Sequence, residues 1–249
     1  MVDVEKWQVR EVVHLLGEQL ESCGVQPLSI ATGRDLVVKA RTRDDDAVNV
    51  WVDGQRSPMP PGVAVSLRDH GIAGGADVVV ETETAGQPGD GLVLTIVDVV
   101  AEPPDRGDEC RRAADALGLE RLADAGPDAV LRLDDEALKA RTRHVITETA
   151  RVRAAERAID SGAWAQLGTI LTASHASLRD DFEVSCAELD VTAEASVEAG
   201  ALGARMNLAL VPADRVAAVR ELVERRFDGA GWHRPEIRSL PLAEATLRH

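Results

Sequence analysis

The apolar pattern changes half-way along this chain of 249 residues, and that change limits the folds it can adopt. The first half carries short runs rich in valine and leucine, at residues 9–16, 36–38, 48–52, 76–83 and 91–100. Runs of this length, separated by turn residues, are typical of strands. One short helix is expected among them, over residues 61–70. The sequence therefore predicts a β-rich first part.

The second half carries apolar residues at helical spacing. Side chains that recur every three to four positions predict helices over residues 140–161, 164–175 and 185–198. Near the end we expect a strand, a helix start and a closing strand, at residues 205–211, 212–214 and 237–240. Strands gathered before helices favour an α+β fold over a doubly wound parallel sheet. The segment 103–107, Pro-Pro-Asp-Arg-Gly, is the best candidate for a connection between a domain at 1–104 and one at 105–249.

Composition excludes several classes of partner. The formal charge of −15 argues against binding to nucleic acid or to an anionic membrane, because both are polyanions. No apolar run approaches the roughly 18 residues of a membrane span, and the first residues lack the basic and apolar regions of a signal peptide. Three widely spaced cysteines form neither a disulfide framework nor a zinc motif. We expect a cytoplasmic protein.

Two segments of the second half are distinctive. Residues 143–152, RHVITETARV, and 173–190, ASHASLRDDFEVSCAELD, resemble the C-terminal region of bacterial galactokinases. The run 200–214 is similar to the same family, and VHLLGEQ at 13–19 resembles the galactokinase signature R-V-N-L-I-G-E-H-T-D-Y. The resemblance implies a GHMP-kinase-like fold, with an N-terminal part like the second domain of ribosomal protein S5 and a ferredoxin-like C-terminal part, both shortened.

The sequence departs from this family at the parts that transfer phosphate. The family holds ATP on a P-x-G-A-G-L-S-S-S-A loop that opens a helix, because backbone N–H groups and the helix dipole converge there on the phosphates. Here the strand at 76–83 leads through a short turn into the strand at 91–100. The family's M-D-Q motif, whose Asp is the catalytic base, has no counterpart. The second loop, T-G-G-G-F-G-G, is replaced by a direct join of Asn207 to Leu208. We therefore expect no ATP binding, no kinase activity, no cofactor and no metal site.

Three residues are candidates for acid–base chemistry. Glu18 matches a Glu that contacts sugar hydroxyls in the family, and Glu21 stands where the family has Asp. Paired carboxylates act as acid and base when a closed pocket separates their pKa values; the alternative is that Gly17-Glu18 only ends a strand. His175 is the third candidate, although it points about 100° away from Ser174 on a helix, and a packing role is the alternative. The candidate ligand-binding residues are Gly17, Glu18, Gln19, Ser174, Arg205 and Asn207.

Three functions remain open. The first is a non-kinase galactokinase-like protein that binds a small polar, sugar-like ligand in a cleft between the two domains. The second is an ATP-independent isomerase, cyclase or lyase that uses Glu18, Glu21 and His175. The third is a structural partner, with a homodimer as one form.

Overall fold

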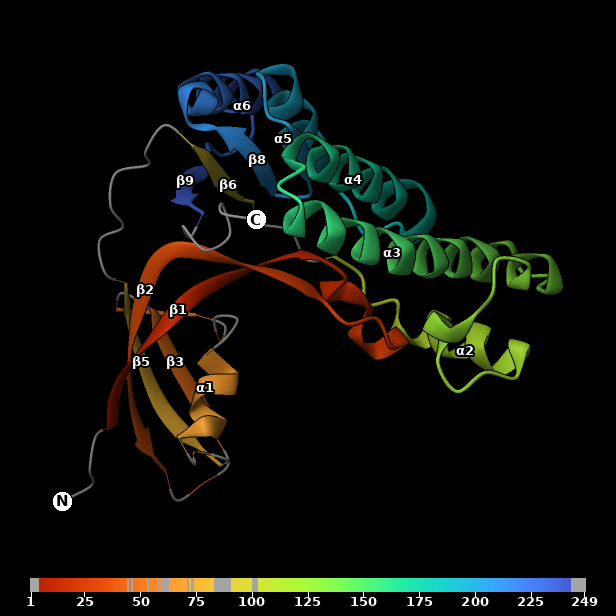
Figure 1. Cartoon of the computed structure of the whole chain (residues 1–249), viewed down its shortest axis with the longest axis horizontal. Coiled ribbons are helices and arrows are strands. Elements are labelled where there is room, and N and C mark those ends of the chain that lie inside the picture. Colours follow the sequence, from red (N-terminus) through yellow and green to blue (C-terminus); the bar gives the residue numbers. More distant parts are fainter. Residues whose placement is uncertain are drawn as a thin grey trace.

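The computed structural model describes residues 5–43, 45, 47–52, 54–57, 59, 63–70, 72, 74–82, 91–99 and 103–242. A strongly curved sheet carries the short helix α1 on one side, and a second sheet lies above it with helices α5 and α6 on top (Figure 1). The long helices α3 and α4 extend to the side of both sheets, and α2 lies at the far end (Figure 1). The fold is α+β, as the sequence predicted.

The first sheet has the strand order β1-β2-β5-β3-β4. Its strands are β1 (Glu5–Leu16), β2 (Leu28–Thr42), β3 (Val48–Val52), β4 (Gln55–Arg56) and β5 (Ala76–Thr82). β3 and β5 are parallel and are joined through α1 (Val63–Asp69), while the other pairs are antiparallel. Alternate residues of β5, Val78 and Val80, are buried against α1, because successive side chains of a strand point to opposite faces.

The second sheet has the order β7-β8-β6-β9, and all its pairs are antiparallel. Its strands are β6 (Leu92–Asp98), β7 (Gly203–Arg205), β8 (Leu208–Pro212) and β9 (Glu236–Pro241). Val93 and Val97 of β6 pack in the core beneath α5 (Ala187–Glu198) and α6 (Val216–Ala230), whereas Leu94 and Ile96 face the largest core. Burial on both faces explains why β6 is a nearly continuous apolar run.

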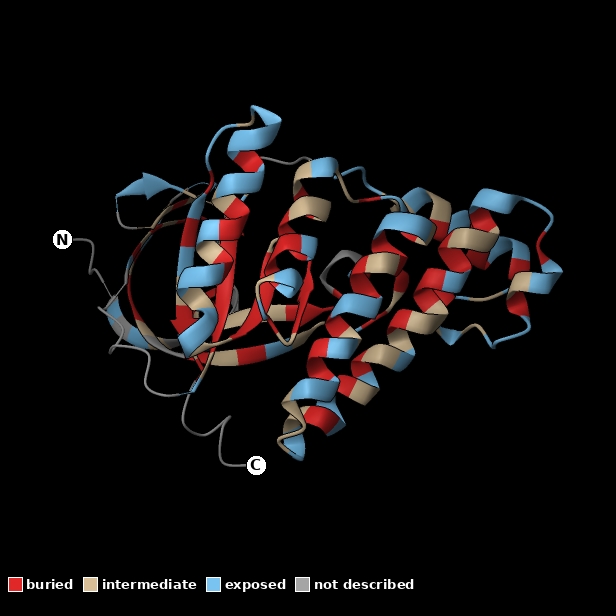
Figure 2. Ribbon diagram, turned by 90° about the horizontal axis from the view of Figure 1, so that it is seen from above, coloured by how far each residue is buried: buried red, intermediate tan, exposed pale blue. Residues whose placement is uncertain are grey.

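The remaining helices surround the largest core. They are α2 (Gly107–Leu117), α3 (Glu136–Asp160) and α4 (Trp164–Ser177), with short segments η1 (Glu18–Cys23), η2 (Leu122–Asp124), η3 (Ala129–Arg132), η4 (Leu178–Phe182) and η5 (Ala213–Arg215). Their buried residues lie on the sides that face the sheets and each other (Figure 2). Residues of β1, η1, β6, β8 and β9 complete this core, so that one apolar interior joins both sheets to the helices.

Most predicted elements are present, although their bounds differ, most of all for β2, which was predicted over 36–38 and spans Leu28–Thr42. The predicted strand 205–211 is divided by a two-residue turn at Met206 and Asn207, because Arg205 pairs directly with Leu208. The helix α2 was missed. β6 lies before the expected boundary at residue 104 but pairs with the C-terminal strands β8 and β9; the division at 104/105 stays a prediction. The short turn expected between the strands at 76–83 and 91–100 lies outside the described residues.

A candidate ligand cavity between η1 and α2

A sharp turn presents η1 to the helices. β1 ends at Leu16, and Gly17 follows with a left-handed φ of 81°. A Cβ at Gly17 would lie 3.2 Å from the carbonyl oxygen of Gln26, so that a larger residue is disfavoured by both conformation and space. η1 ends at Cys23, and Gly24 follows with a φ of 90°, where an added Cβ would lie 3.0 Å from the Arg121 side chain. The two glycines thereby fix η1 beside the segment that follows α2.

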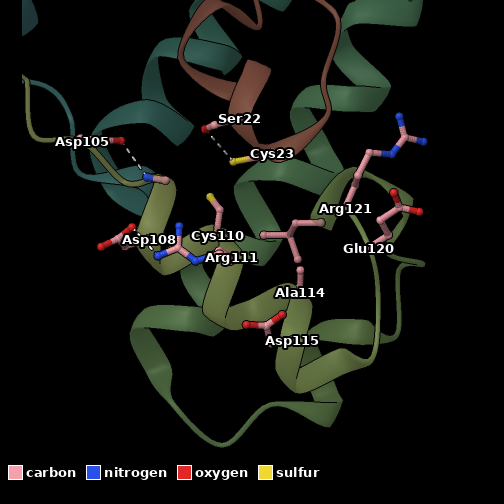
Figure 3. A pocket seen from close by; sticks show the side chains of 12 residues that line it. Ser22, Cys23, Asp105, Asp108, Cys110, Arg111, Ala114, Asp115, Glu120 and Arg121 are labelled. Atoms are coloured by element: carbon pink, nitrogen blue, oxygen red, sulfur yellow. Dashed lines mark hydrogen bonds and ion pairs between the residues drawn. The ribbon is translucent and has the colours of Figure 1, made fainter.

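A cavity of about 350 Å³ lies between η1 and α2. Its buried lining consists of Cys23, Cys110, Ala114 and Leu122. Its exposed lining is polar and consists of Ser22, Asp105, Asp108, Arg111, Asp115, Glu120 and Arg121 (Figure 3). We call this space the η1–α2 cavity. Its volume is at the lower end of the range of about 300–1,000 Å³ that is usual for small-molecule sites.

The rim of the η1–α2 cavity is acidic. Four carboxylates and two guanidiniums line it. Arg111 is paired with Asp108 at 2.6 Å, and the carboxylate of Asp105 accepts a hydrogen bond of 2.8 Å from the backbone N–H of Gly107 at the start of α2. Because the negative charges exceed the positive ones, the rim favours a neutral or cationic ligand over an anionic one.

Two cysteines from different elements meet at the buried side of this cavity. Cys23 at the end of η1 and Cys110 in the first turns of α2 are each only 2% exposed, and their sulfur atoms point towards each other (Figure 3). The neighbouring Cys110 thiol lowers the pKa of Cys23 against the opposing effect of burial, and the Ser22 hydroxyl, 3.9 Å from the Cys23 sulfur, acts in the same direction as Cys110. The contact with Cys23, together with burial, raises the pKa of Cys110.

Gly17, Glu18, Gln19 and Glu21 all belong to the turn or to η1, as a single front segment. The side chains of Glu18 and Gln19 lie outside the described part of the structure. The Glu21 side chain is exposed and does not line the η1–α2 cavity, although the next two residues, Ser22 and Cys23, do. The roles predicted for these four residues remain predictions.

Ser174 and Arg205 lie in a buried ionic cluster centred on Glu148 of α3. The Ser174 hydroxyl donates to both Glu148 oxygens, at 2.7 and 2.9 Å, and accepts from Arg205 Nε at 3.0 Å. Arg151 Nε donates to the second Glu148 oxygen at 2.6 Å. Burial acts to raise the pKa of Glu148, but the guanidiniums of Arg205 and Arg151 outweigh it and hold the pKa below 4.5. Neither Ser174 nor Arg205 lines the η1–α2 cavity.

His175 lies on the side of α4 that faces α5 and the β7–β8 turn. Its Nδ1 accepts a hydrogen bond of 3.1 Å from the backbone N–H of Met206, and its Nε2 lies 3.3 Å from an Asp190 carboxylate oxygen that also accepts from Ser185. Burial lowers the pKa of His175. The histidine lines a second, mainly apolar groove of about 440 Å³ between α4, α5 and β7. Thus Glu21 and His175 do not share either of these two cavities.

Asn207 occupies the turn between β7 and β8, where its carbonyl oxygen accepts a hydrogen bond of 2.9 Å from Val97. Met206, the first residue of this turn, has a left-handed φ of 52°. In the described ranges, no group of three or more His, Cys, Asp or Glu side chains could hold a metal ion. None of the described helices is long and apolar enough to cross a membrane.

The sequence did not reveal the α2 side of the cavity. Cys110, Ala113, Ala114 and Leu117 are the buried residues of α2 and recur at helical spacing. This was the available signal, but three of the four residues are small. Small side chains make a weak apolar stripe, and no helix was predicted from it.

No protein-family model matches the chain. Galactokinases match it in sequence: that of Streptomyces lividans is 33% identical over 218 residues, or 77% of this chain and 54% of the relative. The galactokinase of Streptomyces coelicolor is 40% identical over 141 residues, which are 51% of this chain and 36% of the relative. That of Mycobacterium tuberculosis H37Rv is 37% identical over 164 residues, which are 59% of this chain and 45% of the relative. The chain is galactokinase-like. It spans about half the length, or less, of these relatives.

Solved structures agree on the fold. Lactococcus lactis galactokinase complexed with galactose aligns with a TM-score of 0.65 and 20% identity, over 97% of this chain and 94% of that one. Leishmania major mevalonate kinase in complex with R-mevalonate aligns with a TM-score of 0.55 and 12% identity, over 97% and 99%. The fold is therefore that of the GHMP kinases, in a shortened form.

Proposed function

We propose that this galactokinase-like chain binds a small, neutral, polyhydroxylated ligand in the η1–α2 cavity and does not transfer phosphate. The observation that carries the proposal is the cavity itself. It joins the segment that resembles the sugar-contacting signature of the family to the first helix after β6. Its place between η1, which follows the first strand, and the helices supports a ligand site there.

The lining supports a polyol. The buried side offers Ala114 and Leu122, against which the C–H face of a sugar ring packs. The rim offers carboxylates, which accept hydrogen bonds from hydroxyl groups, and guanidiniums, which donate to them. Hydrogen bonds that involve a charged partner are stronger than neutral ones, so that a few rim contacts suffice to orient a small ligand.

Two short connections support the loss of phosphoryl transfer. β5 ends at Thr82 and β6 begins at Leu92, which leaves nine residues between strands of different sheets. A phosphate loop and the helix that follows it need more than nine residues, because the first turn of that helix supplies the aligned N–H groups that bind phosphate. β7 and β8 are joined by two residues, where the related kinases carry a glycine-rich loop. A γ-phosphate would therefore lack the positioning groups that phosphoryl transfer requires.

Calorimetric titration with three ligands tests the proposal. We expect galactose to bind, and galactose 1-phosphate and ATP·Mg²⁺ to give no heat of binding, because the acidic rim repels phosphate. Asp115→Asn and Glu120→Gln change exposed rim carboxylates and should each weaken galactose binding about tenfold. Asp134→Asn changes an exposed carboxylate outside the cavity and is the matched control. Binding of ATP·Mg²⁺, a failure of galactose and related sugars to bind, or unchanged binding by both rim variants would overturn the proposal.

A further inference from the structure

The two cysteines of the η1–α2 cavity combine three properties that a purely structural pair does not need. They come from segments 87 positions apart in the chain, their sulfur atoms point towards each other (Figure 3), and both line a cavity that opens to solvent. A buried cysteine that only packs in a core is inert, because reagents do not reach it. Here both cysteines line a cavity that opens to solvent, which gives a small oxidant a route to them.

We propose that Cys23 and Cys110 are a redox-sensitive dithiol, which a peroxide converts into a disulfide that joins η1 to α2. The proposal does not depend on which ligand occupies the cavity. In the oxidised protein a covalent bond then joins η1, which follows the first strand, to the helix α2, whereas in the reduced protein the same contact is non-covalent. Reversible disulfides of this kind are typical of redox sensing where structural disulfides are rare.

The order of the steps follows from the local chemistry. Cys23 is the attacking residue, since the Ser22 hydroxyl lies 3.9 Å from its sulfur and stabilises the thiolate, which is the nucleophile. It attacks one oxygen of hydrogen peroxide, the O–O bond breaks, and the hydroxide that leaves takes up the proton lost by Cys23. The product is a sulfenic acid on Cys23.

The Cys110 sulfur then attacks the Cys23 sulfur. The S–O bond breaks, the S–S bond forms, and the hydroxyl group leaves as water with the proton of Cys110. In total, two thiols are oxidised and one peroxide is reduced to two waters. The contact between the two thiols places Cys110 where a resolving cysteine must be.

The third cysteine supplies the background for the test. Cys186 lies before α5 and is half-buried, so that Cys186→Ser leaves only the pair. We expect hydrogen peroxide to make this variant lose two hydrogen atoms in mass and to leave no thiol for alkylation after denaturation. Dithiothreitol should restore both thiols, and peptide mapping should recover residues 23 and 110 linked in one species. Two alkylated thiols after oxidation, or oxygen added to Cys23 in place of the disulfide, would overturn the proposal.

A second variant separates the two steps. With Cys110→Ser on the Cys186→Ser background, the sulfenic acid on Cys23 should persist and react with dimedone, whereas the parent should give little dimedone adduct. Equal labelling of the two proteins would contradict a resolving role for Cys110. The oxidised parent should also melt roughly 5 to 10 °C above the reduced form, because a disulfide restricts the unfolded chain. A lower melting temperature on oxidation would count against a bond that fits the native geometry.

Discussion

Glu148 and Arg205 face each other inside the protein, with Oε1 and Nε 4.0 Å apart and side chains exposed by only 1% and 3%. Ser174 connects them by hydrogen bonds to both, and Arg151 adds a second positive charge from α3. Glu148 is on α3, Ser174 on α4 and Arg205 on β7, so the cluster joins two helices to the second sheet. These polar residues of the galactokinase-like segments therefore have a structural role within the helical part.

Neutralising Glu148 should cost a large part of the stability. Glu148→Gln leaves the buried guanidinium of Arg205 beside a neutral amide, and the loss of one partner of a buried pair costs about 3–5 kcal/mol. Urea unfolding followed by circular dichroism measures this loss. Glu156→Gln, an exposed acid on the same helix, should change the free energy of unfolding by less than about 0.5 kcal/mol. Equal effects of the two variants would contradict a buried ionic cluster.

Stability should fall as the pH is lowered from about 6.5 to about 4 because of His144. Burial lowers the pKa of this histidine from 6.5 to about 4, and its Nδ1 is 2.8 Å from the Ser177 hydroxyl. Between these pH values the unfolded chain binds a proton that the folded chain does not, so acid favours unfolding, by about 3 kcal/mol across the window. Burial of His175 acts in the same direction.

Replacing His144 tests whether this residue, rather than another group, causes the loss of stability in acid. Unfolding curves at several pH values should be flatter for His144→Asn than for the wild type, whatever the absolute stability of the variant. His233→Asn, at an exposed histidine, should keep the slope of the wild type. A slope that survives in His144→Asn would show that another group is responsible.

A close contact between two glycines should tolerate no side chain. A Cβ at Gly168 of α4 would overlap the carbonyl oxygen of Leu202, and one at Gly203 of β7 would overlap that of Gly168. Because backbone atoms cannot move aside as a flexible side chain does, Gly168→Ala should cost about 3 kcal/mol. Gly229→Ala lies in α6 with open space around it and should stabilise the protein by up to about 1 kcal/mol. Thermal unfolding of both variants decides the matter; a neutral Gly168→Ala would contradict the packing of α4 on β7.

The elements with strong periodicity were predictable from the sequence, but the strands and helices that each of them contacts in space were not. β6 is a clear apolar run, yet nothing in that run indicates that it leaves the first sheet and pairs with β8 and β9. The turn at Met206 and Asn207 was hidden because two-residue hairpin turns usually carry glycine where φ is positive, and Met206 adopts φ 52° without it.

The candidate site was half predictable. The front motif directed attention to residues 17–21, and the cavity begins one residue later, at Ser22. The other wall consists of residues 105–122, which no motif distinguishes. Long-range packing brings α2 against η1, and it depends on side chains such as Leu20, Cys23, Cys110 and Ala114 in a shared core. The spacing of residues within each segment does not show that two segments far apart in the sequence pack together.

The proposed binding mode is tested most directly by hydrogen–deuterium exchange of the whole chain with galactose or with ATP·Mg²⁺. Bound ligand slows exchange where it contacts or orders the backbone. We predict slower exchange with galactose in η1 and in residues 105–122, and no change with ATP·Mg²⁺ anywhere in the chain. Protection by ATP·Mg²⁺ between β5 and β6 or at the β7–β8 turn would contradict the account, because nucleotide would then be held at the two connections that we consider too short for it.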